Sequence, residues 1–316
     1  MNNSSGFRCD VDGQPDHLTP EHQLKQYATD TGYALFLDQS CQLTAPGEVP
    51  REIAADRRLI DGFASLKDVA WKRDPASQAW QPFWLSPQVH SRLSELAKEE
   101  PAPRFDPLCE NALVLAGILQ PDFADGRRDP RVVTLSQATE QVRQRGFAPV
   151  AGLIHPFHIS ALRRYFRRRI RTGKLPLGDC QSSRRYYAHN DSVARFFHSQ
   201  LTAAVGAIFA VPVKPSYVYF ASYQGGAFLE EHTDRDQCEF SISLCLDYSP
   251  EPKCQTPWPL QLHTPQGLTT VYQSIGDALL YRGCRVPHSR GVLAPSHTSS
   301  SIFFHYVPVD FNGPLD

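Results

Sequence analysis

A segment in the middle of the chain has apolar residues at the three- and four-residue spacing that is typical of an amphipathic helix. These residues are Ile159, Leu162, Phe166 and Ile170, and Gly173 follows them. Glycine often ends a helix because it adopts the left-handed backbone conformation without strain. The pattern therefore predicts a helix that stops at Gly173.

A second helix is predicted to start at Asp191 or Ser192, since both side chains are good N-caps. Its apolar positions are Val193, Phe197, Leu201 and Val205. We expect this helix to end at Gly206.

From Lys214 onward the apolar period changes to two, which is the period of a β-strand. One strand face is predicted to hold Tyr217, Tyr219, Ala221 and Tyr223, and a later one Phe240, Ile242, Leu244 and Leu246. Further strands are expected at 260–263, 269–272, 278–281 and 300–307. Short strands at such even spacing indicate a sandwich or barrel. We therefore expect an α+β chain whose C-terminal half is mainly β, a two-sheet jelly roll preceded by helices.

The rest of the chain has weaker patterns. Residues 1–20 are rich in Ser, Asn, Asp and Gly and are expected to form a disordered tail. We expect residues 21–130 to form an accessory, substrate-side region, in which the apolar run 112–119 is a buried helix. A linker at 125–130 then leads to the main domain, 131–316.

Composition excludes several classes of protein. The 316 residues include 32 Lys and Arg against 33 Asp and Glu, so the net charge of -1 creates no long-range field for nucleic acid. No run approaches the roughly 18 apolar residues that a membrane span needs, and the polar N-terminus does not resemble a secretory signal. We expect a cytoplasmic protein without membrane association. Nothing in the sequence indicates its oligomeric state.

The eight cysteines are scattered and form no Cys-x-x-Cys pair, so we expect free, mostly buried thiols. Between residues 151 and 200 there are ten Lys or Arg but only two Asp. Six of these arginines lie on the first predicted helix, at Arg163, Arg164, Arg167, Arg168, Arg169 and Arg171. A solvated helix face is the favoured interpretation, and an anionic partner such as nucleic acid is the alternative.

The candidate chemistry lies in His232-Thr233-Asp234 and in His288, 54 positions after Asp234. Residues i and i+2 of an extended segment point to one face, so His232 and Asp234 can bind one ion together. His288 follows a Gly276-Asp277 turn and an apolar strand, and can complete the site. Two imidazoles and one carboxylate leave part of a metal's coordination sphere open, as in non-haem Fe(II) oxygenases. Zinc with a bound water is the second interpretation.

With these residues the sequence resembles the 2-oxoglutarate- and Fe(II)-dependent dioxygenases, specifically the prolyl-4-hydroxylase-like group with the double-stranded β-helix fold. The resemblance covers roughly residues 131–316. It is carried by Tyr223-Gln-Gly-Gly, by His232-Thr-Asp234, and by Gly276-Asp-Ala-Leu-Leu-Tyr281 leading to His288.

The resemblance implies that His232, Asp234 and His288 bind Fe(II), with 2-oxoglutarate and O2 as co-substrates and ascorbate as an accessory reductant. It also implies that 2-oxoglutarate is converted to succinate and CO2 while a C–H bond is hydroxylated. Halogenases of this superfamily typically carry Gly or Ala where this chain has Asp234, which argues against halogenation.

The chain departs from the family pattern at the anchor for the distal carboxylate of 2-oxoglutarate. The usual Arg or Lys, nine to eleven residues after the distal histidine, is replaced by His297, Thr298 and Ser299. Arg290 lies two residues after His288 and so on the same strand face. Its planar guanidinium can form two parallel hydrogen bonds to a carboxylate. We therefore favour Arg290 as the anchor, with His297 as the alternative or a partner.

Three further side chains are candidates for roles in the site. The resemblance gives Tyr223 a hydrogen bond to the co-substrate, although packing explains a strand tyrosine equally well. Arg235 and Gln237 follow the metal pair and are candidates for substrate contacts.

The sequence therefore predicts a hydroxylase acting on an amino-acid or peptide side chain or a related small metabolite. A cupin-type metal-dependent hydrolase or isomerase and a catalytically silent jelly-roll binding protein are the alternatives. Nucleic acid is disfavoured as a substrate, because an AlkB-like demethylase is expected to have arginines after the distal histidine, and none follows Arg290.

Overall fold

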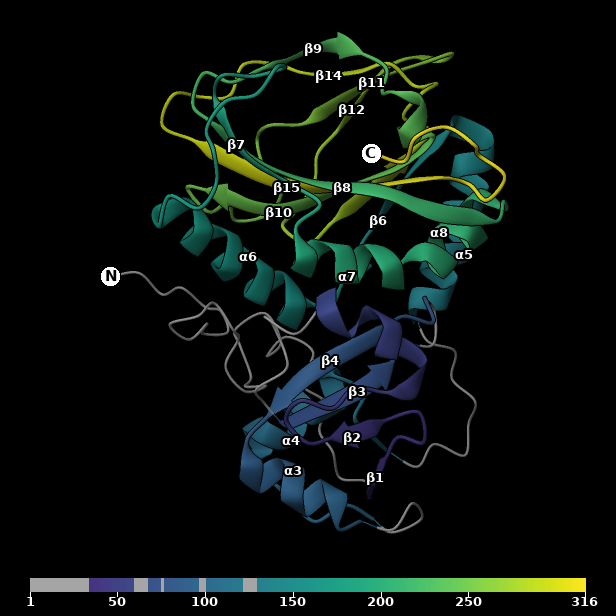
Figure 1. Ribbon diagram of the computed structural model, residues 1–316, viewed down its shortest axis with the longest axis vertical. Coiled ribbons are helices and arrows are strands. Elements are labelled where there is room, and N and C mark those ends of the chain that lie inside the picture. The colour runs from purple at the N-terminus through teal and green to yellow at the C-terminus, as the bar shows by residue number, and fades with distance from the viewer. Residues whose placement is uncertain (1–33, 60–67, 75–76, 97–100, 122–129) are drawn as a thin grey trace. The chain divides into compact units, whose positions relative to one another are not determined.

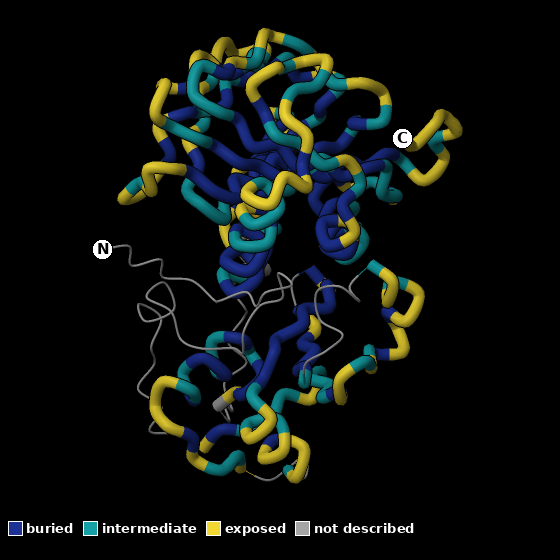
Figure 2. Tube along the Cα trace, turned by 60° about the vertical axis from the view of Figure 1, so that its left-hand side comes forward, coloured by how far each residue is buried: buried dark blue, intermediate teal, exposed yellow. Residues whose placement is uncertain are grey.

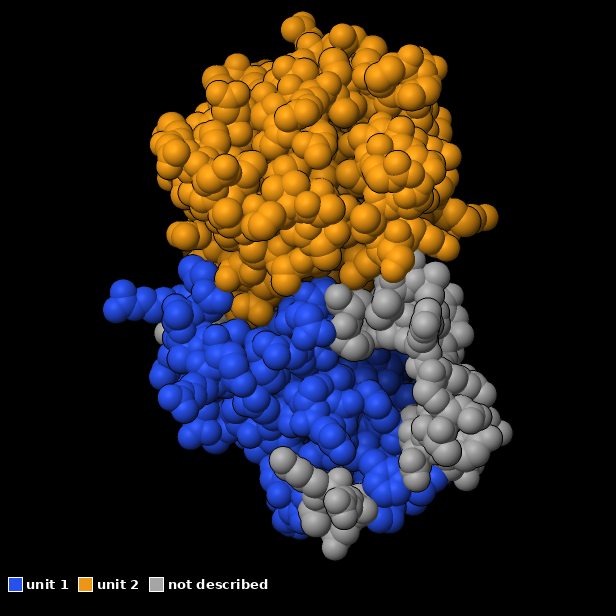
Figure 3. All heavy atoms as spheres, turned by 90° about the vertical axis from the view of Figure 1, so that its right-hand side faces the viewer, with its two compact units in different colours: residues 1–128, 155–165 blue, residues 129–154, 166–316 orange. Residues whose placement is uncertain are grey.

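The computed structural model describes residues 34–59, 68–74, 77–96, 101–121 and 130–316. The chain divides into two compact units (Figure 3). Unit 1 contains residues 1–128 and 155–165, and unit 2 contains residues 129–154 and 166–316. Within the described residues, no helix is both long and apolar enough to cross a membrane.

Unit 1 has two small antiparallel sheets. One has the order β2-β3-β4, with bounds Gln42–Thr44, Asp68–Arg73 and Trp80–Leu85. The other pairs β1 (Leu35–Leu37) with β5 (Leu119–Pro121). Its helices are η1 (Arg51–Asp56), α3 (Pro87–Ser94) and α4 (Pro107–Leu115). The buried rings of Phe83 and Trp84 pack against Phe157, so unit 1 has a hydrophobic core of its own.

Unit 2 contains a six-stranded antiparallel sheet with the order β6-β13-β10-β15-β8-β7. The bounds in this order are Phe147–Val150, Ala278–Tyr281, Phe240–Ser249, Thr298–Pro308, Val213–Gln224 and Arg185–His189. One face of this sheet carries the helical layer, which includes α7 (Ser192–Gln200) and α8 (Thr202–Phe209) (Figure 1). The helix α5 (Pro130–Arg145) packs against α8, and α6 (Pro156–Arg171) reaches the sheet with its second half.

The other face of the large sheet is covered by a four-stranded antiparallel sheet with the order β12-β11-β14-β9 (Figure 1). Its strands are Gly267–Val271, Leu260–Thr264, His288–Arg290 and Leu229–His232, and the short helix η2 (Asp236–Cys238) follows β9. A buried cluster that includes Leu260, Leu262, Leu279 and Tyr281 joins the two sheets. Buried segments form the interior of unit 2, while exposed ones gather in its outer loops (Figure 2).

The predicted helices are present, with one correction. Helix α6 ends before Gly173, whose φ of 68° is left-handed as expected. Asp191 caps α7 by accepting bonds from the backbone N–H groups of Val193 and Ala194. The single helix expected up to Gly206 is wrong, because α7 ends at Gln200 and α8 then continues to Phe209. Burial of apolar side chains on α8 outweighs the helix-weakening effect of a glycine.

The strands predicted from Lys214 onward are all present within a few residues of their expected bounds. Leu246 is an exception to the predicted face, because a β-bulge lies between Cys245 and Asp247. A bulge adds one residue to one strand and reverses the faces beyond it. Asp247 therefore follows Leu244 on the helix-covered face, and Tyr248 lies on the face toward the small sheet.

Two expectations for the N-terminal region need correction. The apolar run 112–119 is not one helix, because α4 ends at Leu115 and Gly117 then turns the chain, with φ of 70°, into β5. The strands β3 and β4 were not predicted; β4 is buried on both faces, so it lacks alternation. The expected tail, 1–20, and all but the last residue of the linker, 125–130, lie outside the described residues.

Part of the basic surface of α6 is paired within the protein. Arg167 binds Asp247 through two hydrogen bonds of 2.5 and 2.7 Å, and Arg169 pairs with Asp191. Arg163 is buried. These contacts favour the structural interpretation of the arginine cluster over a nucleic-acid surface.

The seven described cysteines are all free, as predicted. Only Cys238 and Cys245 are buried, however, so the expectation of mostly buried thiols was wrong.

Helix α6 is held to the large sheet by the stacked rings of Phe166 and Phe220, whose centroids are 3.9 Å apart. We expect Phe166→Ala to lower the free energy of unfolding by about 3–5 kcal/mol, because it leaves a cavity in a dry interface. Phe228→Ala, at a half-exposed position, is the control. Equal losses for both variants in urea unfolding would contradict this role of the stack.

Candidate metal centre and co-substrate cavity

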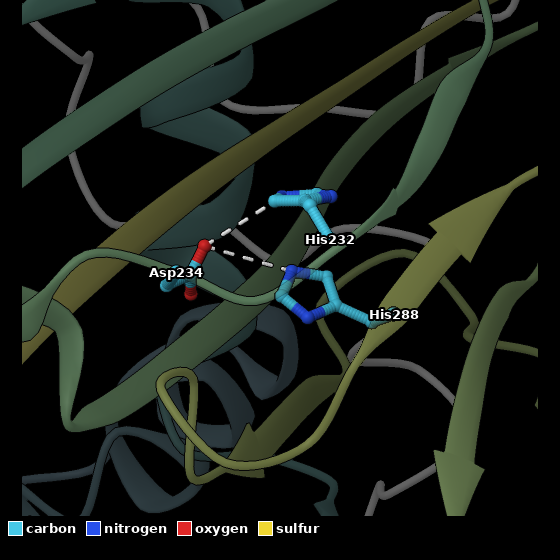
Figure 4. A group of neighbouring side chains, drawn as sticks. All are labelled: His232, Asp234 and His288. Carbon is cyan, nitrogen blue, oxygen red and sulfur yellow. Dashed lines mark ion pairs between the residues drawn. The ribbon is translucent and has the colours of Figure 1, made fainter.

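Strand pairing brings the two candidate histidines together. In the antiparallel pairing of β9 with β14, His232 lies directly opposite His288. Their ring centroids are 4.4 Å apart, although 56 positions separate them in the sequence. Both side chains point toward Asp234 (Figure 4).

Asp234 completes the group. Its Oδ1 lies 3.7 Å from Nε2 of His232 and 3.6 Å from Nε2 of His288 (Figure 4). Its Oδ2 accepts a hydrogen bond of 3.3 Å from the Ser241 hydroxyl, and its backbone N–H donates to Gly283. The three ligand atoms lie within 4.8 Å of one another, which is compatible with a single ion at about 2.0–2.2 Å from each.

The hydrogen bonds of the imidazoles fit a metal site. Nδ1 of His232 lies 2.8 Å from the Glu230 carbonyl oxygen, and Nδ1 of His288 lies 3.0 Å from that of Val286. A carbonyl only accepts, so each Nδ1 carries the proton and each Nε2 keeps its lone pair. Burial lowers the pKa of His288, which also keeps this ring neutral. Carbonyl groups that hold ligand histidines in this way are usual around protein metal sites.

A second group of possible ligands, Asp234 with Cys238 and His305, overlaps the first among the described residues. It is less suited to a metal, because burial raises the pKa of the Cys238 thiol to about 12 and a thiol binds metal as the thiolate. The sulfur also contacts the Tyr217 hydroxyl at 3.1 Å. Nδ1 of His305 lies 2.9 Å from the Ser241 hydroxyl, so this side chain belongs to the hydrogen bonds that hold Asp234.

The three residues of the first group line a cavity of about 440 Å³. Other predicted residues that line it are Tyr223, Arg235 and Arg290. His297 and Gln237 are not among its lining residues. The volume is in the usual range for small-molecule sites, about 300–1,000 Å³.

Arg290 is a buried cation. No carboxylate of the described residues forms an ion pair with it. Its Nη1 donates to the Trp258 carbonyl oxygen at 2.7 Å, and its Cζ lies 4.8 Å from the centre of the Trp258 ring. Burial lowers the pKa of Arg290, but arginine stays protonated in proteins. A buried charge without a partner is costly, so this position favours an anionic ligand.

The two candidate anchors are therefore in different environments. Nδ1 of half-buried His297 is 2.7 Å from the Tyr248 hydroxyl. Arg290 is among the residues that line the cavity, whereas His297 is not. This arrangement favours Arg290 as the residue that meets a ligand.

The structure adds a site residue that the sequence analysis missed. Arg185 on β7 is buried in the cavity wall and donates from Nη1 to the Tyr223 hydroxyl at 3.0 Å. It also pairs with Asp179 at 2.6 Å and donates to Gln181 at 2.8 Å. The alternation of Arg185, Tyr187 and His189 was an available strand signal, since these residues share one face.

No family model matches the chain, and no curated protein matches it in sequence. Solved structures do resemble it over somewhat more than half its length. A prolyl-4-hydroxylase from Pseudomonas putida is 20% identical, with 54% of this chain and 97% of that protein covered and a TM-score of 0.45. A Trichoplax adhaerens prolyl hydroxylase, solved with a hypoxia-inducible factor peptide, is 13% identical, with 54% and 88% covered and a TM-score of 0.46.

A third similar structure is that of SnoN, a non-heme α-ketoglutarate-dependent epimerase of nogalamycin biosynthesis. It is 14% identical, with 57% of this chain and 84% of that protein covered and a TM-score of 0.47. SnoN has also been solved with Fe3+ and α-ketoglutarate.

Gly283 allows Asp234 to approach the loop that precedes β14. A Cβ added at Gly283 would overlap Asp234 Oδ2 and the Cys238 carbonyl oxygen. We expect Gly283→Ala to weaken Fe(II) binding about 10- to 100-fold, because it displaces a ligand and its Ser241 partner. Anaerobic Fe(II) titration measures this change.

Gly291→Ala is the matched control, since a Cβ there meets nothing within 4 Å. It should bind Fe(II) as the wild type does. Wild-type affinity in Gly283→Ala would show that Asp234 does not depend on this close approach.

Proposed function

We propose that the protein is an Fe(II)- and 2-oxoglutarate-dependent dioxygenase. Its substrate is a C–H group of an amino-acid or peptide side chain or of a related small metabolite. One observation carries the proposal: two imidazole Nε2 atoms and one carboxylate oxygen converge in a cavity that also contains the unmatched buried cation Arg290. The triad offers three ligands to a metal, and the cation offers a partner to an anionic co-substrate.

In this proposal His232, Asp234 and His288 hold the iron. Bound Fe(II) supplies the redox chemistry by which O2 converts 2-oxoglutarate to succinate and CO2 and a substrate C–H group to C–OH. The backbone carbonyls of Glu230 and Val286 keep the two imidazoles in the ligating tautomer. Ser241 orients the carboxylate of Asp234 by donating to Oδ2.

Arg290 binds the distal carboxylate of 2-oxoglutarate. It shares the cavity with the buried Tyr223, whose hydroxyl accepts from Arg185 and has its own proton to donate to the same carboxylate. Residue 299, in the family's anchor region, is a serine. In the pairing of β15 with β8 it lies opposite Tyr223. Ser299 carries no charge, so Arg290, which lies in the opposite sheet, is the cation that binds the carboxylate.

The chain order of the sheets supports the double-stranded β-helix assignment. The strands β8, β10, β13 and β15 lie in the large sheet, and β9, β11, β12 and β14 lie in the small one. The chain therefore passes repeatedly between two facing sheets, as a jelly roll does. The metal ligands come from β9, the segment after it, and β14.

The cupin-type hydrolase and the silent binding protein remain outcomes of the experiments below. A hydrolytic zinc site accounts for the triad but gives no role to an unmatched buried guanidinium. We also propose that residues 21–130 contribute to substrate selection, since all the metal-ligand and anchor candidates lie in unit 2.

The first test removes the metal ligands. We expect His232→Ala and His288→Ala each to abolish succinate formation and to lose Fe(II) binding, because two ligands no longer hold the ion. The measurements are anaerobic Fe(II) titration and 2-oxoglutarate turnover. Full iron binding in both variants would refute the assignment, and a wild type that hydrolyses an ester but forms no succinate would favour the hydrolase.

The second test separates the two anchors. Arg290→Ala should weaken 2-oxoglutarate binding by about two orders of magnitude or more, because a buried charge-assisted pair loses one partner. His297→Ala should have a much smaller effect. Dissociation constants of 2-oxoglutarate for both variants decide the point.

The same measurement tests the alternative. If His297 is the anchor, affinity in Arg290→Ala will be largely kept. Near-wild-type affinity in Arg290→Ala would rule out our assignment.

A further inference from the structure

Aromatic side chains from three neighbouring strands line one wall of the cavity, which we call the aromatic wall. They are Tyr187 and His189 of β7, Tyr217 and Tyr219 of β8, and Phe303 and His305 of β15. The rings of Tyr187 and Tyr219 are nearly parallel, at 9° with centroids 5.8 Å apart. Tyr217 packs against His189 on one side and His305 on the other, at 5.1 and 4.7 Å.

Part of this wall is not covered by protein. Tyr187, Tyr219 and Phe303 are only half-buried although they line the cavity. No described side chain hydrogen-bonds to the Tyr187 hydroxyl, so this ring is not fixed by a polar role. Uncovered, nearly parallel rings offer a surface on which another planar ring can stack.

Arg235 stands beside the aromatic wall and directly after the metal ligand Asp234. Its Nη2 donates to the Tyr217 hydroxyl at 3.0 Å, and its Cζ lies 5.3 Å from the centre of that ring. No carboxylate of the described residues forms an ion pair with it. Arg185, in the same cavity, differs because Asp179 neutralises it. Arg235 is exposed, unlike Arg185 and Arg290, but its contacts with Tyr217 hold its guanidinium at the cavity with donors to spare.

The charges of the cavity indicate the charge of the substrate. Its lining contains three arginines, Arg185, Arg235 and Arg290, and two aspartates, Asp179 and Asp234. In the proposed complex, Asp234 and the two carboxylates of 2-oxoglutarate balance Fe(II) and Arg290, and Asp179 balances Arg185. Arg235 is then the lining cation to which no anion is assigned.

The described residues that line the cavity offer no free carboxylate to an ammonium group. Asp179 already accepts from Arg185 and from the Tyr219 hydroxyl. Asp234 faces the two histidines and Ser241. A free amino acid would bring an ammonium that neither carboxylate is available to bind.

We propose that the substrate is a small monoanion that combines a planar ring with a carboxylate and has no free ammonium. Arg235 binds the carboxylate, and the ring stacks on the aromatic wall at Tyr187 and Tyr219. The inference rests on the proposed function, because the charge balance includes Fe(II) and 2-oxoglutarate.

The experiment uses three probes on the full chain, loaded anaerobically with Fe(II) and saturating 2-oxoglutarate. Phenylacetate carries ring and charge, phenylacetamide carries the ring alone, and hexanoate carries the charge alone. Calorimetric titration should show phenylacetate binding at least about tenfold more tightly than either of the others. Equal affinities, or no binding of phenylacetate, would overturn the proposal.

Arg235→Gln should weaken phenylacetate binding about tenfold or more and leave phenylacetamide binding unchanged. Its matched control is Arg184→Gln, because Arg184 is exposed, does not line the cavity and donates from its side chain to the Gly225 carbonyl oxygen. An unchanged phenylacetate affinity in Arg235→Gln, or an equal loss in both variants, would contradict the assigned contact.

The ring contact is tested at Tyr187. Tyr187→Leu should remove most of the preference for phenylacetate over hexanoate, whereas Tyr187→Phe should keep it, because only the aromatic face is needed. Loss in both variants, or in neither, would contradict stacking at this position.

Failure of this inference is distinguishable from failure of the proposed function. Fe(II) and 2-oxoglutarate binding are titrated first, without any probe. If both bind but the probes are not discriminated, only the substrate inference is wrong. If neither binds, the proposed function is wrong, and the charge balance, which includes Fe(II) and 2-oxoglutarate, no longer applies.

Discussion

The candidate site depends on the register between two short strands. His232 ends β9, His288 begins β14, and the antiparallel pairing sets them opposite each other. A slip of one residue would turn every side chain of a strand to its other face. A slip of β14 would turn His288 and Arg290 away from the interior together. The small sheet fixes this register from both sides, because β14 pairs with β9 on one edge and with β11 on the other.

Charge organises the interior between the two sheets. Arg185 is matched within the protein by Asp179, and its third donor group holds Tyr223. Arg290 is equally buried, but the guanidinium contacts shown by the described residues are a carbonyl oxygen and an aromatic face. This contrast distinguishes an arginine with a structural role from one that can bind a ligand. An unmatched buried charge is stable only when a group of opposite charge can reach it.

The sequence predicted those elements of the fold that have a clear local pattern of apolar and polar residues. Strand patterns located β8, β10, β11, β12, β13 and β15 but not the short strands β9 and β14, and helical spacing with Gly173 and Asp191 located α6 and the start of α7. Prediction failed where a pattern was absent or interrupted. Strand β4 is buried on both faces, so it shows no alternation. The bulge after Cys245 depends on pairing with β15 and reverses the face of Leu246 without any sign in the local sequence.

The sequence by itself determined the chemistry of the candidate metal site, because the residue types and the i, i+2 spacing of His232 and Asp234 are local properties. It also placed Arg290 on the same strand face as His288. Only the tertiary structure decided which groups surround them. Arg185 meets Tyr223 across 38 positions, and His305 meets Ser241 across 64. Such contacts arise from sheet pairing and packing between distant segments, which no local spacing encodes.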